Sequence, residues 1–359
     1  MDGFKNIKIN KFRGINHLEI DDFSRVNVFL GQNSSGKSSV LECILLLMGM
    51  SNPDLPQTIN AIRSRSFSNF ADLGYLFHNY DLKTKPDVAA ELFDETKRHL
   101  TLEMTYMFDE KSQVSEQNGH IPTSETKTFL NTLKMAFDIE SGQNKKSYEC
   151  SLTINPQGMI SNKRLAEGYL EKNSVAFISS DLAAGNPAND LVELAKRKRK
   201  DIVTERLQYF DSRITTLEIL NNVAYIGLDG IDQLLTVNMQ GDGLRRYLNI
   251  VAASANPANN ILLIDEIENG LHYSAYKKLW EAIFALAVGT NKQIFVTTHS
   301  KETLQKLNLM LTEHQEYQQE MRLYTIANTL KKGHQAYKYT YDGLSGACEN
   351  DVELRGRVL

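Results

Sequence analysis

The segment Gly31-Gln32-Asn33-Ser34-Ser35-Gly36-Lys37-Ser38 matches the pattern G-x-x-x-x-G-K-[ST] at every fixed position. In such a loop, glycines let the backbone curl until successive N–H groups face one anion, and the next helix adds its positive N-terminal end. The lysine neutralises the β- and γ-phosphates of a nucleotide, and the serine hydroxyl binds Mg²⁺. The alternative is a glycine turn without a ligand.

The residues around this loop have the order strand, loop, helix that a phosphate site requires. Apolar and polar residues alternate between Ile7 and Leu30, which predicts short strands. Residues 39–50 are largely apolar with no breaker before Gly49, which predicts a buried helix. We therefore predict a site for ATP and Mg²⁺, with Ser38 also holding the metal. The expected ATP-binding residues of this loop are Gly31, Gln32, Asn33, Ser34, Ser35, Gly36, Lys37, Ser38 and Ser39.

A second acidic motif follows a buried strand near the other end of the chain. Four apolar residues, 261–264, lead directly to Asp265 and Glu266. After a P-loop, such a pair predicts a Walker B motif in which Asp265 holds Mg²⁺ and Glu266 polarises the attacking water. Taken alone, an Asp-Glu pair at the end of a strand is often only a solvated strand end.

A third strand, 294–297, also ends in polar residues, and His299 lies just beyond it. About 33 residues separate His299 from Glu266, which is room for one helical crossover to a neighbouring strand. We predict that His299 reaches the γ-phosphate and is catalytic together with Glu266 and Lys37. The alternative is a structural histidine.

The fourth motif is a glycine-rich turn, Gly241-Asp242-Gly243, at the start of a predicted helix. Free N–H groups at a helix start can bind an anion, so this turn is a candidate phosphate contact. The alternative is a plain helix N-terminus capped near Asp242.

Composition narrows the function class. With 359 residues, 42% of them hydrophobic, the chain can form a large core without staples. The net charge of −4, from 40 basic and 44 acidic residues, indicates no general affinity for nucleic acid or anionic membranes. The 3 cysteines lack metal-type spacing, which favours a reducing compartment, and no apolar run could span a bilayer. We expect a cytoplasmic protein with neither a signal peptide nor a membrane anchor.

The predicted elements indicate an α/β fold with a mainly parallel core sheet, because helices and strands alternate over residues 244–297. Residues 100–108 and 148–154 alternate as strands of an antiparallel side sheet, with a polar stretch at 110–128 between them. Residues 191–209 predict one helix. We expect a single domain over 1–359, with 1–50 and 223–359 as nucleotide-binding core and 52–222 as antiparallel and helical insert.

Together these motifs, with the opening segment 7–14 and residues 264–272, resemble the ABC-type ATPase heads of the OLD, RecF and SMC group, and in particular OLD-like heads of phage-defence operons. The resemblance implies a P-loop ATPase whose two heads dimerise around ATP, with Gly241, Asp242 and Gly243 acting in trans. It implies a D-loop at residues 268–272 and a nucleotide contact for Arg13. It also implies a partner effector, a nuclease or toxin, because no TOPRIM-type acidic cluster follows Ser300.

Two alternatives remain open. A RecF-like repair ATPase would bind DNA, and the basic run 196–200 is a candidate phosphate contact or a solvated helix face. An assembly scaffold would bind ATP with little turnover, since Gln240 stands where related heads carry the signature serine.

Overall fold

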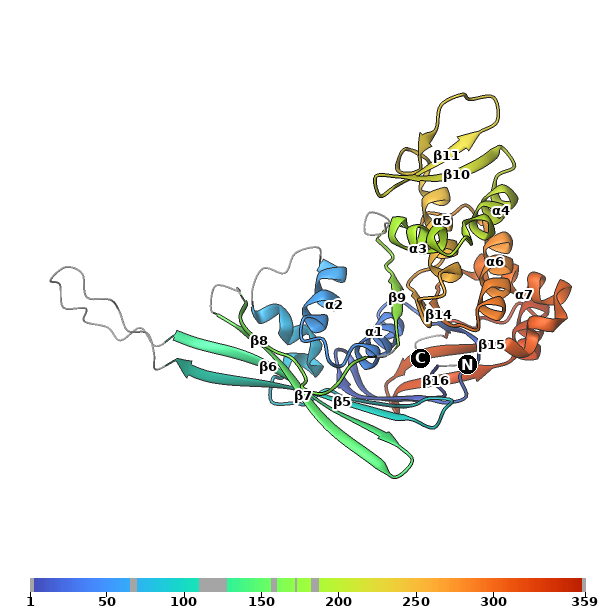
Figure 1. Ribbon diagram of the computed structural model, residues 1–359. Helices are drawn as coiled ribbons and strands as arrows, with labels where there is room; N and C mark the ends of the chain where they lie inside the picture. Colours follow the sequence, from blue (N-terminus) through green and yellow to red (C-terminus); the bar gives the residue numbers. More distant parts are fainter. Residues whose placement is uncertain are drawn as a thin grey trace.

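The structure is a computed structural model, and it describes residues 3–64, 70–109, 128–155, 160–171, 173–181 and 187–356. The described residues form two large sheets and one small sheet, with helices between and around them (Figure 1). The polar stretch predicted at 110–128 lies outside the described residues except for Thr128.

A six-stranded sheet carries the predicted nucleotide-binding motifs, in the order β16-β15-β3-β14-β13-β9. Its neighbours are parallel except for the antiparallel β15–β16 hairpin. Every residue of β3, β13 and β14 is buried, as expected for parallel strands covered on both faces. The predicted parallel core is confirmed. The strands are β3 (Val26–Leu30), β9 (Val175–Ile178), β13 (Ile261–Ile264), β14 (Gln293–Thr297), β15 (Met321–Thr329) and β16 (Gly333–Tyr339).

Helices cover both faces of this sheet. On one face, Val26, Val28 and Leu30 pack with the helices that follow β9 in sequence, while Phe29 points to the opposite face and packs with α1. This alternation is the period-2 geometry of a strand. The helices are α1 (Lys37–Met48), α2 (Leu55–Ser64), α3 (Ala188–Lys196), α4 (Lys200–Phe210), α5 (Asp242–Ala255), α6 (Tyr276–Gly289), α7 (Lys301–Glu313) and α8 (Tyr341–Glu349).

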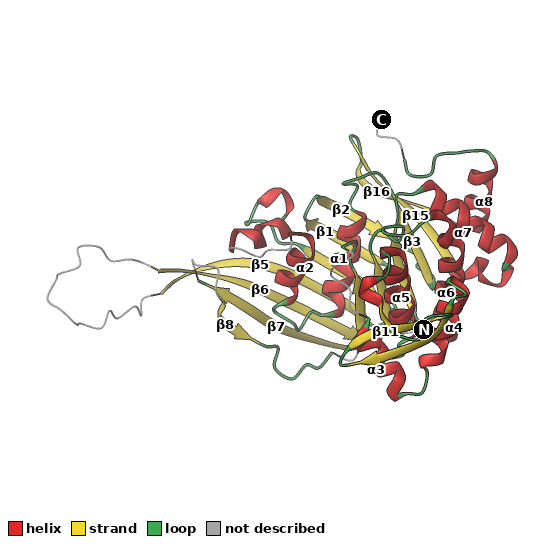
Figure 2. Ribbon diagram, turned by 90° about the horizontal axis from the view of Figure 1, so that it is seen from above, coloured by secondary structure: helices red, strands yellow, loops and turns green. Residues whose placement is uncertain are grey.

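A seven-stranded antiparallel sheet lies on the other side of α1, in the order β2-β1-β4-β5-β6-β7-β8 (Figure 2). α1 is therefore enclosed between two sheets, and Ser38 is its only residue that is not buried. The strands are β1 (Ile7–Phe12), β2 (Ile15–Ile20), β4 (Asp87–Glu91), β5 (Lys97–Asp109), β6 (Thr128–Ser141), β7 (Asn144–Ile154) and β8 (Ile160–Arg164). The predicted antiparallel side sheet is confirmed.

The sheets do not follow the predicted division of the chain at residue 50. β1 and β2 lie within 1–50 but belong to the antiparallel sheet, whereas β9 lies within 52–222 but pairs in parallel with the Walker B strand β13. The reason is that sheet membership depends on long-range hydrogen bonds, which a local pattern does not record.

The helix predicted at 191–209 is two helices. α3 ends at Lys196 and α4 begins at Lys200, and Lys198 between them has a left-handed φ of 56°. Residues 196–201 at the turn are all charged, and a charged run is also typical of an exposed helix face, so the sequence did not mark the break. Beyond α4, a small sheet of β10 (Ile214–Leu220), β11 (Val223–Leu228) and β12 (Leu235–Thr236) precedes α5.

Short 3₁₀ turns connect several elements. They are η1 (Phe70–Leu76), η2 (His78–Tyr80), η4 (Val237–Met239), η5 (Tyr273–Ala275) and η6 (Gln315–Glu320). Among the helices that the structure describes, none combines the length and apolar character needed to cross a membrane.

Candidate functional site

The P-loop joins the end of β3 to the start of α1, as predicted. Gly31 has φ +149°, and a Cβ there would lie 2.4 Å from the carbonyl oxygen of Ile326 on β15. Gly36 is the N-cap of α1 with φ 100°, a left-handed conformation that favours glycine. No side chain caps α1. Both fixed glycines of the motif are therefore required by the backbone, and the start of α1 keeps N–H groups available for an anion.

Lys37 is the charged group beneath this loop. Its Nζ donates hydrogen bonds of 2.8 Å to the carbonyl oxygens of Gly31 and of Gln32. Burial lowers the pKa of Lys37, and Asp265 and Glu266 act in the opposite direction. The ammonium group is thus fixed near the carboxylates that follow β13.

The P-loop and the Walker B strand meet at Asp265. Oδ1 of Asp265 accepts a hydrogen bond of 2.9 Å from the Ser38 hydroxyl and one of 2.6 Å from the Thr297 hydroxyl. These three residues follow or end β3, β13 and β14, which are neighbours in the sheet. The structure therefore brings the two predicted Mg²⁺ ligands together at the carboxyl edge of the parallel strands, where ligands of open α/β sheets bind.

Glu266 has an unusual backbone. Its φ of 47° is left-handed, which costs about 1–2 kcal/mol for a residue with a Cβ. The conformation is held from both sides: Glu266 N donates to Thr297 Oγ1 at 2.8 Å, and Glu266 O accepts from Arg246 at 3.0 Å. Such strain recurs at functional positions.

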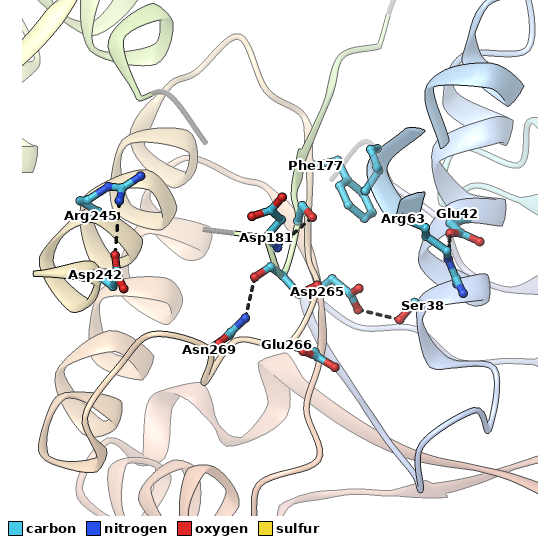
Figure 3. Close-up of a pocket in the computed structure, with 13 residues that line it drawn as sticks. Ser38, Glu42, Arg63, Phe177, Asp181, Asp242, Arg245, Asp265, Glu266 and Asn269 are labelled. Carbon is cyan, nitrogen blue, oxygen red and sulfur yellow. Dashed lines mark hydrogen bonds and ion pairs between the residues drawn. The ribbon is translucent and has the colours of Figure 1, made fainter. Parts of the chain in front are cut away.

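A cavity of about 750 Å³ lies between α1 and α5, and Asp265 and Glu266 line it together with Ser38. Figure 3 shows Asp242 and Arg245 of α5 across this cavity from Ser38, with Asp265 between them. Asp242 is the residue of the predicted signature turn that lines the cavity, and Gly241 and Gly243 flank it. Gly241 is the N-cap of α5, with no side-chain cap bond. α5 therefore begins without a side-chain cap at Asp242, and its first N–H groups are not bound by a capping side chain.

His299 lies beside the first half of the P-loop. It lines a second cavity, of about 520 Å³, with residues 31–33, and its side chain is 49% exposed. Glu268 orients it: one carboxylate oxygen accepts from His299 N at 2.8 Å and lies 3.1 Å from His299 Nδ1. His299 is thus exposed enough to meet a ligand, and it is linked to the predicted D-loop.

The remaining P-loop residues follow the turn of the backbone. Ser34 has a left-handed φ of 63°, and Ser35 and Ser39 are buried. Among the described residues, the Ser35 hydroxyl is buried without a hydrogen-bond partner. Their side chains line neither cavity, so any contact with phosphate from these positions comes from the backbone.

Arg13 does not line either cavity. Its guanidinium is paired with Glu42 of α1 at 2.6 Å and donates to Asn60 Oδ1 at 3.0 Å. Arg63 holds the other oxygen of Glu42 at 2.5 Å, and both Arg63 and Glu42 line the larger cavity. The structure therefore places Arg13 one residue behind the cavity wall, where it supports Glu42.

The basic run 196–200 does not form one helix face. Its residues span the turn between α3 and α4, with Lys196 paired to Glu193 at 2.7 Å and Lys200 paired to Glu218 at 2.8 Å. The arrangement favours a solvated, partly neutralised surface over a continuous phosphate-binding stripe.

Arg246 is a site residue that sequence analysis missed. Its side chain is 2% exposed, and its guanidinium donates to the carbonyl oxygens of Ser179, Asp265 and Glu266. Burial lowers the pKa of Arg246 to about 10. Arg246 therefore links the helix that follows the signature turn to the strand ends that carry the acidic pair. Its place directly after that turn was the available signal.

The residues after β9 were also missed. Ser179, Ser180 and Asp181 line the larger cavity beside Asp265, because β9 pairs with β13 and ends at the same edge of the sheet. A short apolar strand followed by polar residues was the signal, but its place in the sheet could not be read from the sequence.

Comparison with known proteins agrees with this geometry. The model of the AAA ATPase domain matches residues 4–304. An ATP/GTP phosphatase of Helicobacter pylori is 26% identical over 336 residues, which span 86% of this chain and 88% of that protein. The SMC head bound to the C-winged helix domain of ScpA has a similar fold, with a TM-score of 0.51, 10% identity, and coverage of 95% of this chain and 99% of that one. The chain belongs to the AAA ATPase domain family, and it is an ATPase with the α/β P-loop fold of SMC heads.

Proposed function

We propose that this ATPase cleaves the γ-phosphate of ATP by in-line attack of a water molecule that Glu266 orients. The observation that carries the proposal is the joining of Ser38 to Asp265 beside a cavity that Glu266 also lines. Lys37 and the P-loop N–H groups bind the phosphates and neutralise charge as it develops. His299, held by Glu268, contacts the γ-phosphate from the neighbouring strand.

The donor set suits Mg²⁺. A serine hydroxyl and a carboxylate are hard oxygen ligands, and Mg²⁺ prefers one or two of these together with water and phosphate oxygens. Ser38 and Asp265 are the residues that would hold the ion. When bound, the metal would offset the negative charge of the phosphates. The rest of the site, Lys37 and Glu266 above all, supplies binding and water activation.

We further propose that two copies close around ATP. The uncapped start of α5 presents N–H groups that can bind a phosphate, and Met239 just before it is 86% exposed. Both features suit a turn that acts on the nucleotide of a second head. In this proposal the dimer, or a higher oligomer, signals nucleotide state to a partner effector, a nuclease or toxin, in cytoplasmic anti-phage defence. The resemblance to OLD-like heads supports that role.

Two variants test the site and the dimer together. Glu266→Gln keeps the shape of the side chain but removes the base, so it should bind ATP, accumulate as a dimer on size exclusion with light scattering, and release phosphate at least about 10²-fold more slowly. Lys37→Ala should lose nucleotide binding. Wild-type turnover in both variants would exclude this site. A Glu266→Gln chain that stays monomeric with ATP bound would exclude the dimer alone.

The partner is tested separately. Phosphate release is measured with and without the protein product of a neighbouring effector gene, and stimulation or inhibition supports control of that effector. Binding to bare DNA that weakens steeply with salt, and is lost when residues 196–200 are neutralised, would instead favour a RecF-like repair function. ATP-dependent dimers with no phosphate release under any of these conditions would identify a scaffold.

A further inference from the structure

The C-terminal segment 353–356 reaches the P-loop. It follows α8 and passes along β15, where the carbonyl oxygen of the buried Leu354 accepts a hydrogen bond from Thr325. β15 pairs in parallel with β3, the strand that ends in the P-loop. Gln32 Nε2 then donates to the carbonyl oxygen of Gly356 at 2.8 Å. The segment is therefore held beside the loop by the sheet itself.

Arg355 is the cation that this segment brings to the site. It lines the cavity of about 520 Å³ with Gly31, Gln32, Asn33 and His299, and one of its guanidinium nitrogens donates to the carbonyl oxygen of His299 at 3.0 Å. Nothing in the sequence motifs pointed to it, because 318 residues separate it from Lys37.

A neighbouring acid orients the guanidinium. Glu353 receives hydrogen bonds from Arg355 Nε, at 2.7 Å, and from Nη2. Among the described residues, the guanidinium of Arg355 makes three hydrogen bonds: Nε and Nη2 donate to Glu353, and Nη1 donates to the carbonyl oxygen of His299. An arginine has five N–H groups, so one on each terminal nitrogen remains for a ligand. The side chain is 34% exposed, so a ligand in the cavity can reach it.

The cavity lies on the terminal-phosphate side of the P-loop. Lys37, whose ammonium meets the β- and γ-phosphates in P-loop sites, is bound to the carbonyl oxygens of Gly31 and Gln32, which line this cavity. Ser38, the metal-side residue, lines the other cavity. A phosphate between Lys37 and His299 would therefore lie next to Arg355.

We propose that Arg355 binds the γ-phosphate of ATP within its own chain, as a second cation beside Lys37. This inference rests on the proposed function, because it assumes that ATP occupies the P-loop. Arg355 suits the task because a planar guanidinium can donate two N–H groups to one phosphate while Glu353 holds its other edge. The segment 353–356 is then part of the nucleotide site, and it discriminates ATP from ADP.

The test compares AMP-PNP with ADP by calorimetry, both with Mg²⁺. Arg355→Gln should weaken AMP-PNP roughly 10- to 100-fold, the loss of charge-assisted hydrogen bonds, and change ADP affinity less than about twofold. Arg355→Lys keeps the charge, so it should lose less affinity for AMP-PNP and none for ADP. Arg213→Gln is a matched control, because Arg213 makes the same two-oxygen pair with an acid two residues earlier, Asp211, and is 73% exposed.

The deciding quantity is the ratio of the affinity for AMP-PNP to the affinity for ADP. If this ratio equals that of wild type in both Arg355 variants, the proposal is wrong, even where the affinities for both nucleotides fall equally. If Arg355→Gln does not fold, the ratio of AMP-PNP affinity to ADP affinity in Arg355→Lys alone tests the proposal. Lys37→Ala separates the two levels of inference. If Lys37→Ala still binds both nucleotides, the proposed site fails, whereas loss of binding there with an unchanged ratio in the Arg355 variants removes only the role of Arg355.

Discussion

The Ser38 hydroxyl donates a hydrogen bond of 2.9 Å to Oδ1 of Asp265, across a sequence separation of 227 residues. This contact joins the first residues of α1 to the end of β13, and Thr297 completes it from β14. Two motifs recognised separately are thus parts of one site. The contact also predicts how the site depends on metal.

Ser38→Ala and Asp265→Asn should each lower phosphate release by about 10²-fold or more, because the first removes an oxygen ligand for Mg²⁺ and the second replaces a charged carboxylate ligand with a neutral amide. A higher Mg²⁺ concentration should partly restore phosphate release in Ser38→Ala, because the Asp265 carboxylate remains. It should restore phosphate release less in Asp265→Asn. The measurement is steady-state phosphate release across a Mg²⁺ titration. Ser345→Ala, on the outer helix α8, is the control. Identical Mg²⁺ dependence in wild type and Ser38→Ala would contradict the assignment.

His299→Ala should reduce kcat roughly 10- to 100-fold with a smaller change in KM, because a contact to the reacting phosphate gains strength in the transition state. Glu268→Gln should have a smaller effect in the same direction. In the wild type, His299 N donates a hydrogen bond of 2.8 Å to Glu268. The glutamine of the variant can still accept this bond, but it carries no charge beside the imidazole ring. Full kinetic curves for both variants check this. An unchanged kcat in His299→Ala would make the histidine structural.

Arg246→Met should lower the free energy of unfolding by about 2–4 kcal/mol, because carbonyl oxygens of Ser179, Asp265 and Glu266 would lose a buried charged donor. Phosphate release should fall as well, since Glu266 loses one of its two backbone supports. Arg246→Lys should recover part of both losses. Urea unfolding and phosphate release are measured on the same samples. Arg245→Gln, on the same turn of α5, changes a partly exposed side chain that pairs with the exposed Asp242, so it should unfold within about 0.5 kcal/mol of wild type.

We expect the free energy of unfolding to rise with pH because of the buried Lys292. Its side chain is 1% exposed, its Nζ donates to the carbonyl oxygens of Ala253 and Asn256 at the end of α5, and burial lowers its pKa from 10.5 to about 7. Between those values the unfolded chain binds more protons than the folded chain, so the free energy of unfolding increases with pH. Below the lower value the lysine is protonated in both states, and the full cost of burying the charge applies.

The measurement is urea unfolding of wild type and Lys292→Met at several pH values. The difference between the two curves should change by up to about 1.4 kcal/mol per pH unit between roughly pH 7 and 10, and flatten below. Lys331→Met, at an exposed turn, should follow wild type. Parallel curves for wild type and Lys292→Met would show that the buried amine does not titrate in this window.

Local patterns predicted most of the elements that bear the site. The P-loop, its flanking strand and helix, the Walker B strand and the strand before His299 are all where the sequence placed them. These elements have short-range signals: glycines with positive φ, buried apolar runs, and a helix without breakers. The failures have different causes. Local backbone hydrogen bonds close the turn at Lys198, from Lys198 N to Ala195 O and from Arg199 N to Leu194 O, but no glycine marks it. The pairing of β9 depends on a distant strand, and apolar periodicity reports burial without naming the partner.

The order of motifs along the chain settled the fold class and the chemistry, because a phosphate loop and an acidic strand end are defined by residues within a few positions of each other. The path of the folded chain settled which groups meet there. In the folded chain, Arg13 pairs with Glu42, Arg246 binds the backbone of the acidic pair, and Arg355 lies beside the P-loop. Those contacts arise from strand pairing and helix packing between segments that are far apart in the sequence. The free energy that stabilises this packing comes from the burial of many residues together, so no short sequence pattern reveals it.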